Sequence, residues 1–152
     1  MKCFIFKRQP KSYNAWKSNT KAQKDGYKFL LENSYRAFNT TPDLLLDDLY
    51  GVVYFFHKRE TGTDADNISK PVWDCLEEFL YDDDKKIKLR IGGCFDLNEN
   101  DYNILDITDI PTNVSIELIN AFLDDNCDYI VYVECGKLYN NFYKFNLEIN
   151  GD

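Results

Sequence analysis

Residues 64–87 read DADNISKPVWDCLEEFLYDDDKKI and contain two groups of carboxylates separated by about one helix-length of sequence. Asp64 and Asp66 are one residue apart, so in an extended or tightly turned backbone their side chains leave on the same side. The second group lies at 82–84. A strand, a turn and a helix could fold these two groups against each other, and we expect them to meet.

Several carboxylates brought together repel one another, and a hard divalent cation is the usual relief. We therefore expect Mg²⁺, which Mn²⁺ can replace, to be held by Asp64, Asp66, Asp83 and Asp84. Lys70 follows Asp66 by four residues and so projects from the same face of a helix. Carboxylates that hold a metal, with a cation beside them, are suited to hydrolysing a phosphate ester. The predicted catalytic residues are Asp64, Asp66, Lys70 and Asp84.

Two further polar residues accompany this set. Asp74 follows Lys70 by four residues, where its carboxylate could orient the Lys70 ammonium group or accept a structural hydrogen bond. Asn67 stands beside the expected ligands and suits a helix cap better than a metal ligand. Both are expected to support the site from its edge.

The same stretch resembles the RusA family of Holliday junction resolvases. The resemblance rests on the patterns Asp-x-Asp-Asn-x-x-Lys and Tyr-x-Asp-Asp-x-x-Ile with the residues between them, matched here by Asp64, Asp66, Asn67, Lys70, Asp74, Leu76, Tyr81, Asp83, Asp84 and Ile87. Residues 9–14, after a short apolar strand, are similar to that family's proline-rich opening. The resemblance covers roughly residues 1–92.

The resemblance implies a metal-dependent endodeoxyribonuclease that resolves four-way (Holliday) DNA junctions by paired phosphodiester hydrolysis. It also implies a homodimer in which each subunit nicks one strand, and an origin in a phage or prophage. It divides the chain into a RusA-like nuclease core at 1–92 and an acidic C-terminal extension at 93–152 packed on the same domain.

Charge is distributed unevenly along the 152 residues. The net charge is −8, but residues 1–40 carry +7, residues 41–90 carry −5 and residues 91–152 carry −10. A basic front and an acidic rear fit a DNA-facing surface opposite a solvated or partner-facing one, although a basic helix face can also be merely solvated. Apolar runs fall well short of about 18 residues and the first residues do not resemble a signal peptide, so we expect a cytoplasmic protein without a membrane contact.

The N-terminal loop interleaves basic and aromatic residues. The predicted DNA contacts in it are Lys11, Tyr13, Asn14, Trp16 and Lys17. Such side chains can contact the DNA backbone or stack on an opened base. For Trp16 a place in the core is the alternative.

Apolar periodicity predicts the fold class. It indicates strands at 2–7, 50–57 and 86–91, and helices at 20–38, 66–80 and 113–123. Residues 10–20 are expected as a loop, Pro71 in the first turn of its helix, and a hairpin at 135–137 joining strands 129–134 and 138–149. This order predicts a single α/β or α+β domain with a mixed sheet flanked by helices.

Other functions remain open at this point. Asp-x-Asp-Asn occurs often as a turn or cap, in which case the acidic run at 82–84 would be a solvated turn. The chain could also be a non-catalytic DNA- or protein-binding module on a RusA-like scaffold, a reading that its acidity keeps open. A nuclease for other branched DNA is the third possibility.

Overall fold

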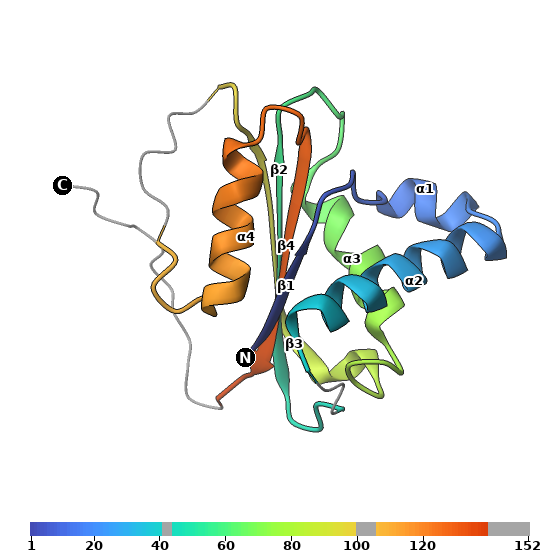
Figure 1. The fold of residues 1–152 in the computed structure, drawn as a ribbon. Helices are drawn as coiled ribbons and strands as arrows, with labels where there is room; N and C mark the ends of the chain where they lie inside the picture. Colours follow the sequence, from blue (N-terminus) through green and yellow to red (C-terminus); the bar gives the residue numbers. More distant parts are fainter. Residues whose placement is uncertain (41–43, 100–105, 140–152) are drawn as a thin grey trace.

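A four-stranded sheet forms the centre of the molecule (Figure 1). The computed structural model describes residues 1–40, 44–99 and 106–139. The strand order is β1-β4-β2-β3, with β1 (Lys2–Phe6), β2 (Leu49–His57), β3 (Ile87–Asp96) and β4 (Tyr129–Lys137). The helices are α1 (Tyr13–Ser18), α2 (Lys21–Phe38), α3 (Ala65–Leu76) and α4 (Thr112–Leu123), with a short 3₁₀ helix, η1 (Asp84–Lys86).

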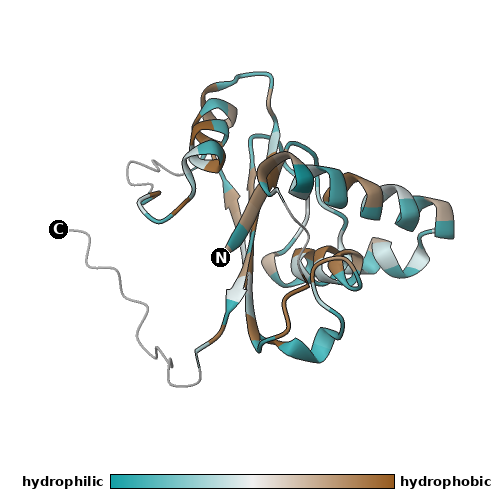
Figure 2. Cartoon of the chain, turned by 60° about the horizontal axis from the view of Figure 1, so that its bottom comes forward, coloured by the Kyte–Doolittle hydropathy of each residue, from teal (hydrophilic) through white to brown (hydrophobic). Residues whose placement is uncertain are grey.

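Helices cover both faces of this sheet. Figure 1 shows α1, α2 and α3 on one side and α4 on the other. In Figure 2 hydrophobic residues gather on the strands and on the helix sides turned toward them, and hydrophilic residues lie outside. The chain is therefore a single α+β domain with a mixed sheet, as the sequence predicts. No described helix combines the length and apolar composition needed to cross a membrane.

Apolar spacing explains why α2 and α3, which cover the same face of the sheet, form helices. On α2 the residues Tyr27, Leu31 and Tyr35 recur every four positions and are buried. Its first turn is closed by a capping box between Thr20 and Gln23. On α3 the buried positions are Ile68, Val72, Trp73 and Leu76, together with Pro71 and Cys75.

Three local predictions are wrong. Residues 13–18 form α1, which Ser12 caps, within the segment expected as a loop. Pro71 lies seven residues into α3, well beyond the first turn, because the helix already begins at Ala65. β3 continues through Gly92 and Gly93 to Asp96, since its second half stays paired with β2.

The hairpin expected at 135–137 is also wrong. Cys135, Gly136 and Lys137 belong to β4 and pair with β2, so the strand extends through them. Most of the strand expected at 138–149 lies outside the described residues. β4 itself lies between β1 and β2 and is antiparallel to both, so the acidic C-terminal part of the chain supplies a central strand.

The β2-α3-β3 unit positions the candidate residues. β2 and β3 are parallel: Leu49 pairs with Ile87 at one end and His57 with Asp96 at the other. Helix α3 connects the strands across one face of the sheet, so its first turn lies toward the end marked by His57. The segment that follows α3 returns to the opposite end, where β3 begins.

Candidate active site

The first carboxylate pair lies on the first turn of α3. Asp64 is the N-cap residue but its side chain makes no capping hydrogen bond, and Asp66 lies two residues further on. Both side chains are exposed, and neither forms a hydrogen bond or ion pair with another described residue. The N-terminus of a helix favours negative charge, which helps to hold two free carboxylates there. Two unpaired carboxylates are the donor type that Mg²⁺ uses together with substrate phosphates.

The end of β3 adds two groups that the sequence reasoning missed. The Cys94 thiol donates to the Thr63 carbonyl at 3.2 Å, which ties β3 to the residue before Asp64. Burial, together with the nearby carboxylates of Asp64 and Asp96, raises the pKa of the Cys94 thiol. Asp96 therefore contributes negative charge near the same end of the sheet. Only the parallel pairing of β2 and β3 brings it there, so no local sequence signal could have identified it.

A glycine allows α3 to begin close to β3. A Cβ atom on Gly92 would lie 2.6 Å from the Ala65 carbonyl oxygen, a distance that no side chain tolerates. The first turn of α3 thus packs directly on the backbone of β3. Gly92 thereby determines where Asp64 and Asp66 lie.

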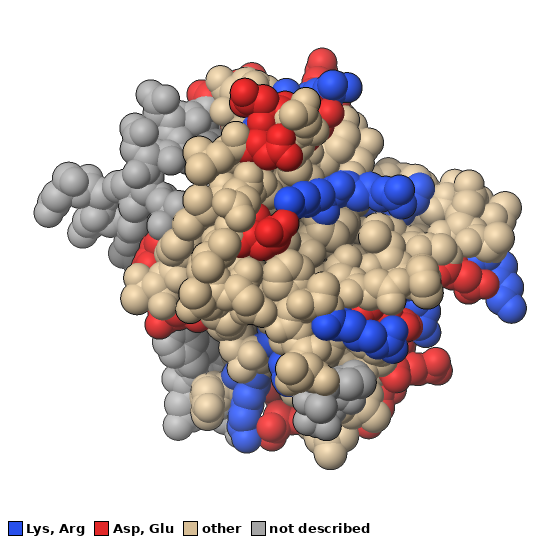
Figure 3. Space-filling view, viewed as in Figure 1, with Lys and Arg blue, Asp and Glu red and all other residues tan. Residues whose placement is uncertain are grey.

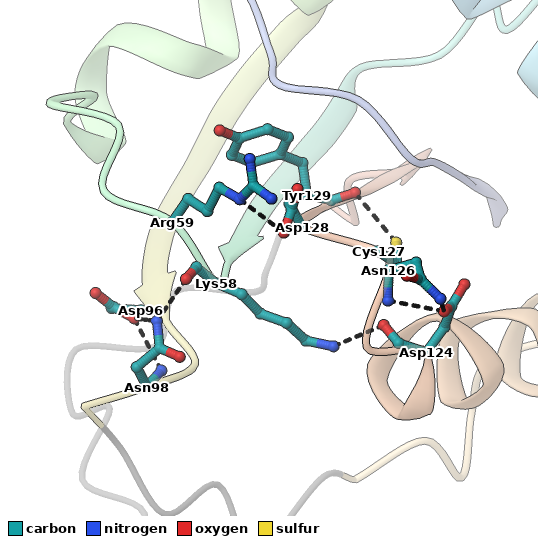
Figure 4. Close-up of polar contacts among 9 residues, drawn as sticks. All are labelled: Lys58, Arg59, Asp96, Asn98, Asp124, Asn126, Cys127, Asp128 and Tyr129. Carbon is teal, nitrogen blue, oxygen red and sulfur yellow. Dashed lines mark hydrogen bonds and ion pairs between the residues drawn. The ribbon is translucent and has the colours of Figure 1, made fainter.

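The loop that leads to Asp64 is anchored at its start, as Figure 4 shows. The Lys58 ammonium group donates to the carbonyl oxygens of Phe122 at 3.2 Å and Asp124 at 2.8 Å, at the end of α4. Arg59 forms an ion pair of 3.0 Å with Asp128, just before β4. These contacts join the chain after β2 to the neighbouring loop before it turns toward the carboxylate pair.

Lys70 is held by Asp74 and not by Asp66. The Lys70 ammonium nitrogen lies 2.9 Å from Asp74 Oδ1, and the other oxygen of Asp74 accepts a hydrogen bond of 3.2 Å from the Trp16 indole N–H. The two alternatives for Asp74, orienting Lys70 and making a structural hydrogen bond, therefore both occur. Asn67 lies in the first turn of α3 with Asp66, and its main-chain N–H donates to the Asp64 carbonyl.

The residues of the N-terminal segment that are predicted to contact DNA differ in how exposed they are. Trp16 is buried against Tyr27 in the core, so it is not available to stack on a base. The Tyr13 ring lies 4.3 Å from the Lys17 ammonium and 5.9 Å from that of Lys70. Lys17 and Asn14 are exposed on α1, and Lys11 is half-buried before it. The segment therefore brings a ring and a cation beside Lys70.

The second acidic group does not meet the first within one chain. Asp83 caps η1 by accepting from the Lys85 N–H at 2.9 Å, Asp82 pairs with Lys86, and Asp84 begins η1. They lie where β3 starts, whereas the first pair lies where β2 ends. Most of α3, whose 12 residues span about 18 Å, lies between them. The approach of the two groups expected from the sequence is absent from the single chain.

This separation bears on the expected metal site. In the parts of the chain that the structure describes, no three acidic, histidine or cysteine side chains are grouped so that they could hold a metal ion. The four predicted ligands therefore do not surround one ion in a single chain. The pair at Asp64 and Asp66 fits part of a Mg²⁺ site, and further ligands would have to come from elsewhere.

Basic side chains do not form one continuous surface on the face drawn in Figure 3, where uncharged surface separates several blue patches and red patches lie beside some of them. The basic residues are therefore concentrated in the N-terminal part of the sequence, but they do not gather into one basic surface on this face. No protein-family model matches the chain, and no curated protein is found to be similar to it.

Proposed function

We propose that the chain is a Mg²⁺-dependent endodeoxyribonuclease that hydrolyses phosphodiester bonds in branched DNA, with the four-way junction as its main substrate. The observation that carries the proposal is the unpaired carboxylate pair on the first turn of α3, with Lys70 held in place one turn further along. We place the enzyme in the cytoplasm, where its five free thiols would persist.

The residues of this chain would divide the work. Asp64 and Asp66 would hold Mg²⁺, which when bound lowers the pKa of water and neutralises charge on a phosphate. Lys70 would donate to a non-bridging phosphate oxygen or to the leaving oxygen, where negative charge develops. Its ion pair with Asp74 limits the positions of the ammonium group before DNA binds.

We further propose that the enzyme is a homodimer and that each metal site takes ligands from both subunits. Support comes from β3, the outermost described strand on its side of the sheet, whose residues 88–92 are all exposed. A bare edge strand can pair with another chain. If two copies of β3 pair antiparallel about a two-fold axis, the start of each lies near the end of the other. Asp83 and Asp84 of one subunit would then approach the carboxylate pair of its partner.

The charges along β3 favour such a pairing. Lys88 and Arg90 stand in its first half, and Asp96 ends it near the Cys94 thiol, which also lies near Asp64. Antiparallel pairing sets the basic half of one strand against the acidic end of the other, whereas parallel pairing would set like charges together. Leu89 and Ile91, which are 41% and 39% exposed, would become buried in the interface.

Cleavage of a synthetic four-way junction tests the activity, beside duplex and flap DNA of matched sequence, with Mg²⁺, Mn²⁺ or EDTA. We expect paired, metal-dependent nicks confined to the junction, and Asp66→Asn should abolish them while junction binding persists. Asp47→Asn is the matched control, because its exposed ion pair with Lys137 lies away from the pair on α3. Binding without cutting in either metal would instead indicate a non-catalytic module.

Mixing two inactive variants tests the shared site. If ligands come from both subunits, a heterodimer of Asp66→Asn and Asp84→Asn chains contains one site with both lesions and one intact site. Nicking of a single strand should therefore return on mixing. If each site belongs to one chain, every site in the mixture carries a lesion and nicking stays absent.

A further inference from the structure

A polar cleft of about 710 Å³ lies next to the carboxylate pair. Its walls come from the segment after β1, from one side of α2, and from the loop 61–63 that precedes Asp64. Thr63 is part of the wall, so the cleft ends one residue from the pair. Its volume is in the range of pockets that bind small organic molecules, and so suits nucleotides better than a double helix.

The cleft carries positive charge that no described acidic residue neutralises. Arg8 and Lys11 line it, and none of its lining residues is acidic. Neither cation forms an ion pair with another described residue. In a chain of net charge −8, two unpaired cations beside hydroxyl and amide side chains favour an anionic ligand such as a phosphate.

A glycine inside α2 lines the cleft and leaves room there for a larger side chain. Gly26 lines it, and a Cβ atom at this position would meet nothing within 4 Å. Glycine inside a helix costs about 1 kcal/mol relative to alanine. A common reason to keep it is that another element must approach the helix closely. Here no described neighbour does so, and the free space belongs to the cleft. Under the wall, the buried Tyr27 hydroxyl has no hydrogen bond of ordinary geometry.

An exposed aromatic ring follows the cleft residue Gly26 on α2, although it does not line the cleft itself. Phe29 is 67% exposed and lies three residues after Gly26, on the adjoining side of α2. A basic groove with an aromatic ring at its rim is how proteins hold unpaired nucleic acid, since the cations follow the backbone and the ring stacks on a base. We propose that this cleft binds unpaired nucleotides of the DNA strand whose phosphate reaches Asp64 and Asp66.

This inference rests on the proposed nuclease function and specifies its substrate. A branch point exposes nucleotides that a continuous duplex keeps stacked, so a cleft for one strand beside the carboxylates would select branched DNA. It would also set the distance between the cut and the unpaired bases, because the 61–63 loop joins the cleft to the pair.

Filling the cleft tests the proposal. The Gly26→Leu side chain would project into the free space without displacing the fold, and Ala37→Leu, at an exposed position of α2 outside the cleft, is the matched control. Binding is measured by fluorescence anisotropy with an oligothymidine of about ten nucleotides in EDTA, so that cleavage plays no part. We expect Gly26→Leu to weaken binding tenfold or more with an unchanged or higher melting temperature, while Ala37→Leu binds like the unaltered chain.

Charge removal gives a second readout. Arg8→Gln and Lys11→Gln should each make the plot of log affinity against log salt shallower by about 0.7. Unchanged binding by Gly26→Leu would overturn the proposal, as would duplex DNA that binds as tightly and is weakened equally by this variant. If oligothymidine binding depends on Gly26 but no metal supports cleavage, the proposed activity fails while the binding site stands.

Discussion

The Lys70 ammonium nitrogen lies 2.9 Å from Asp74, and that carboxylate also accepts the indole N–H of Trp16. The core residue Trp16 thus holds the Asp74 carboxylate in place, and that carboxylate in turn holds the half-exposed Lys70 ammonium group. Because α1 carries Trp16 and α3 carries the other two, the packing of α1 on α3 determines where the lysine points.

Asp74→Asn should impair cleavage through Lys70. The amide can still accept from Trp16, so we expect less than about 1 kcal/mol of lost stability, as for an exposed ion pair. The cleavage rate should fall about tenfold, because the ammonium group is no longer held. A double-mutant cycle measures this: Asp74→Asn should have no further effect once Lys70→Gln is present. Additive losses in rate would show that Asp74 acts independently of the lysine.

Gly92→Ala should displace the carboxylate pair. The new methyl group would press on the Ala65 carbonyl, a backbone atom that cannot move aside alone. We expect cleavage to fall by at least tenfold while far-ultraviolet circular dichroism still reports the native secondary structure. Gly26→Ala, which meets nothing, is the control for adding a methyl group. Unaltered cleavage by Gly92→Ala would mean that the first turn of α3 need not lie there.

Gly51→Ala should destabilise the fold. Its Cβ atom would lie 2.5 Å from the ring of Trp73, which is fully buried in the core. Such overpacking costs about 1–3 kcal/mol. Urea unfolding measures the loss. A midpoint equal to that of the unaltered chain would contradict the packing of α3 on β2.

Alkaline pH should weaken the fold through buried thiols. Burial raises the pKa of Cys75 and of Cys135 from 9.0 to about 12. Above pH 9 an unfolded thiol loses its proton while the folded one keeps it, so stability falls as pH rises toward 12. The slope is on the order of 1 kcal/mol per pH unit for each thiol. Urea unfolding between pH 7 and 11 measures it, and Cys135→Ala should give a shallower slope.

Periodic elements could be predicted from the sequence, and elements defined by distant partners could not. The helix from 21 to 38 carries an apolar repeat, and the strand from 49 to 57 is a nearly continuous run rich in Val, Tyr and Phe. α1 has only six residues, too few to show an apolar repeat. From the sequence alone, Trp16 could be a buried core residue or an exposed aromatic residue, and the structure shows it buried. Gly136 reads as a turn, yet its place in β4 depends on pairing with β2.

In the candidate site, too, local contacts could be predicted from the sequence, whereas the positions of distant groups could not. Helical spacing alone predicts that Lys70 and Asp74 can pair, and they do. The positions of the two acidic groups depend on the direction of β3, which is parallel to β2. A strand-helix-strand crossover places the residues before its helix and those after it at opposite ends of the sheet. Recognising that crossover would have predicted the separation.

The central position of β4 constrains how the chain folds during synthesis. β1 and β2 do not pair with each other and meet only through a strand that ends at Lys137. Until the ribosome has released that strand, the N-terminal segment has no described partner in the sheet, and contacts of such long sequence separation form slowly. A chain stopped at residue 92 would carry every proposed catalytic residue and still lack the strand that joins them into one domain.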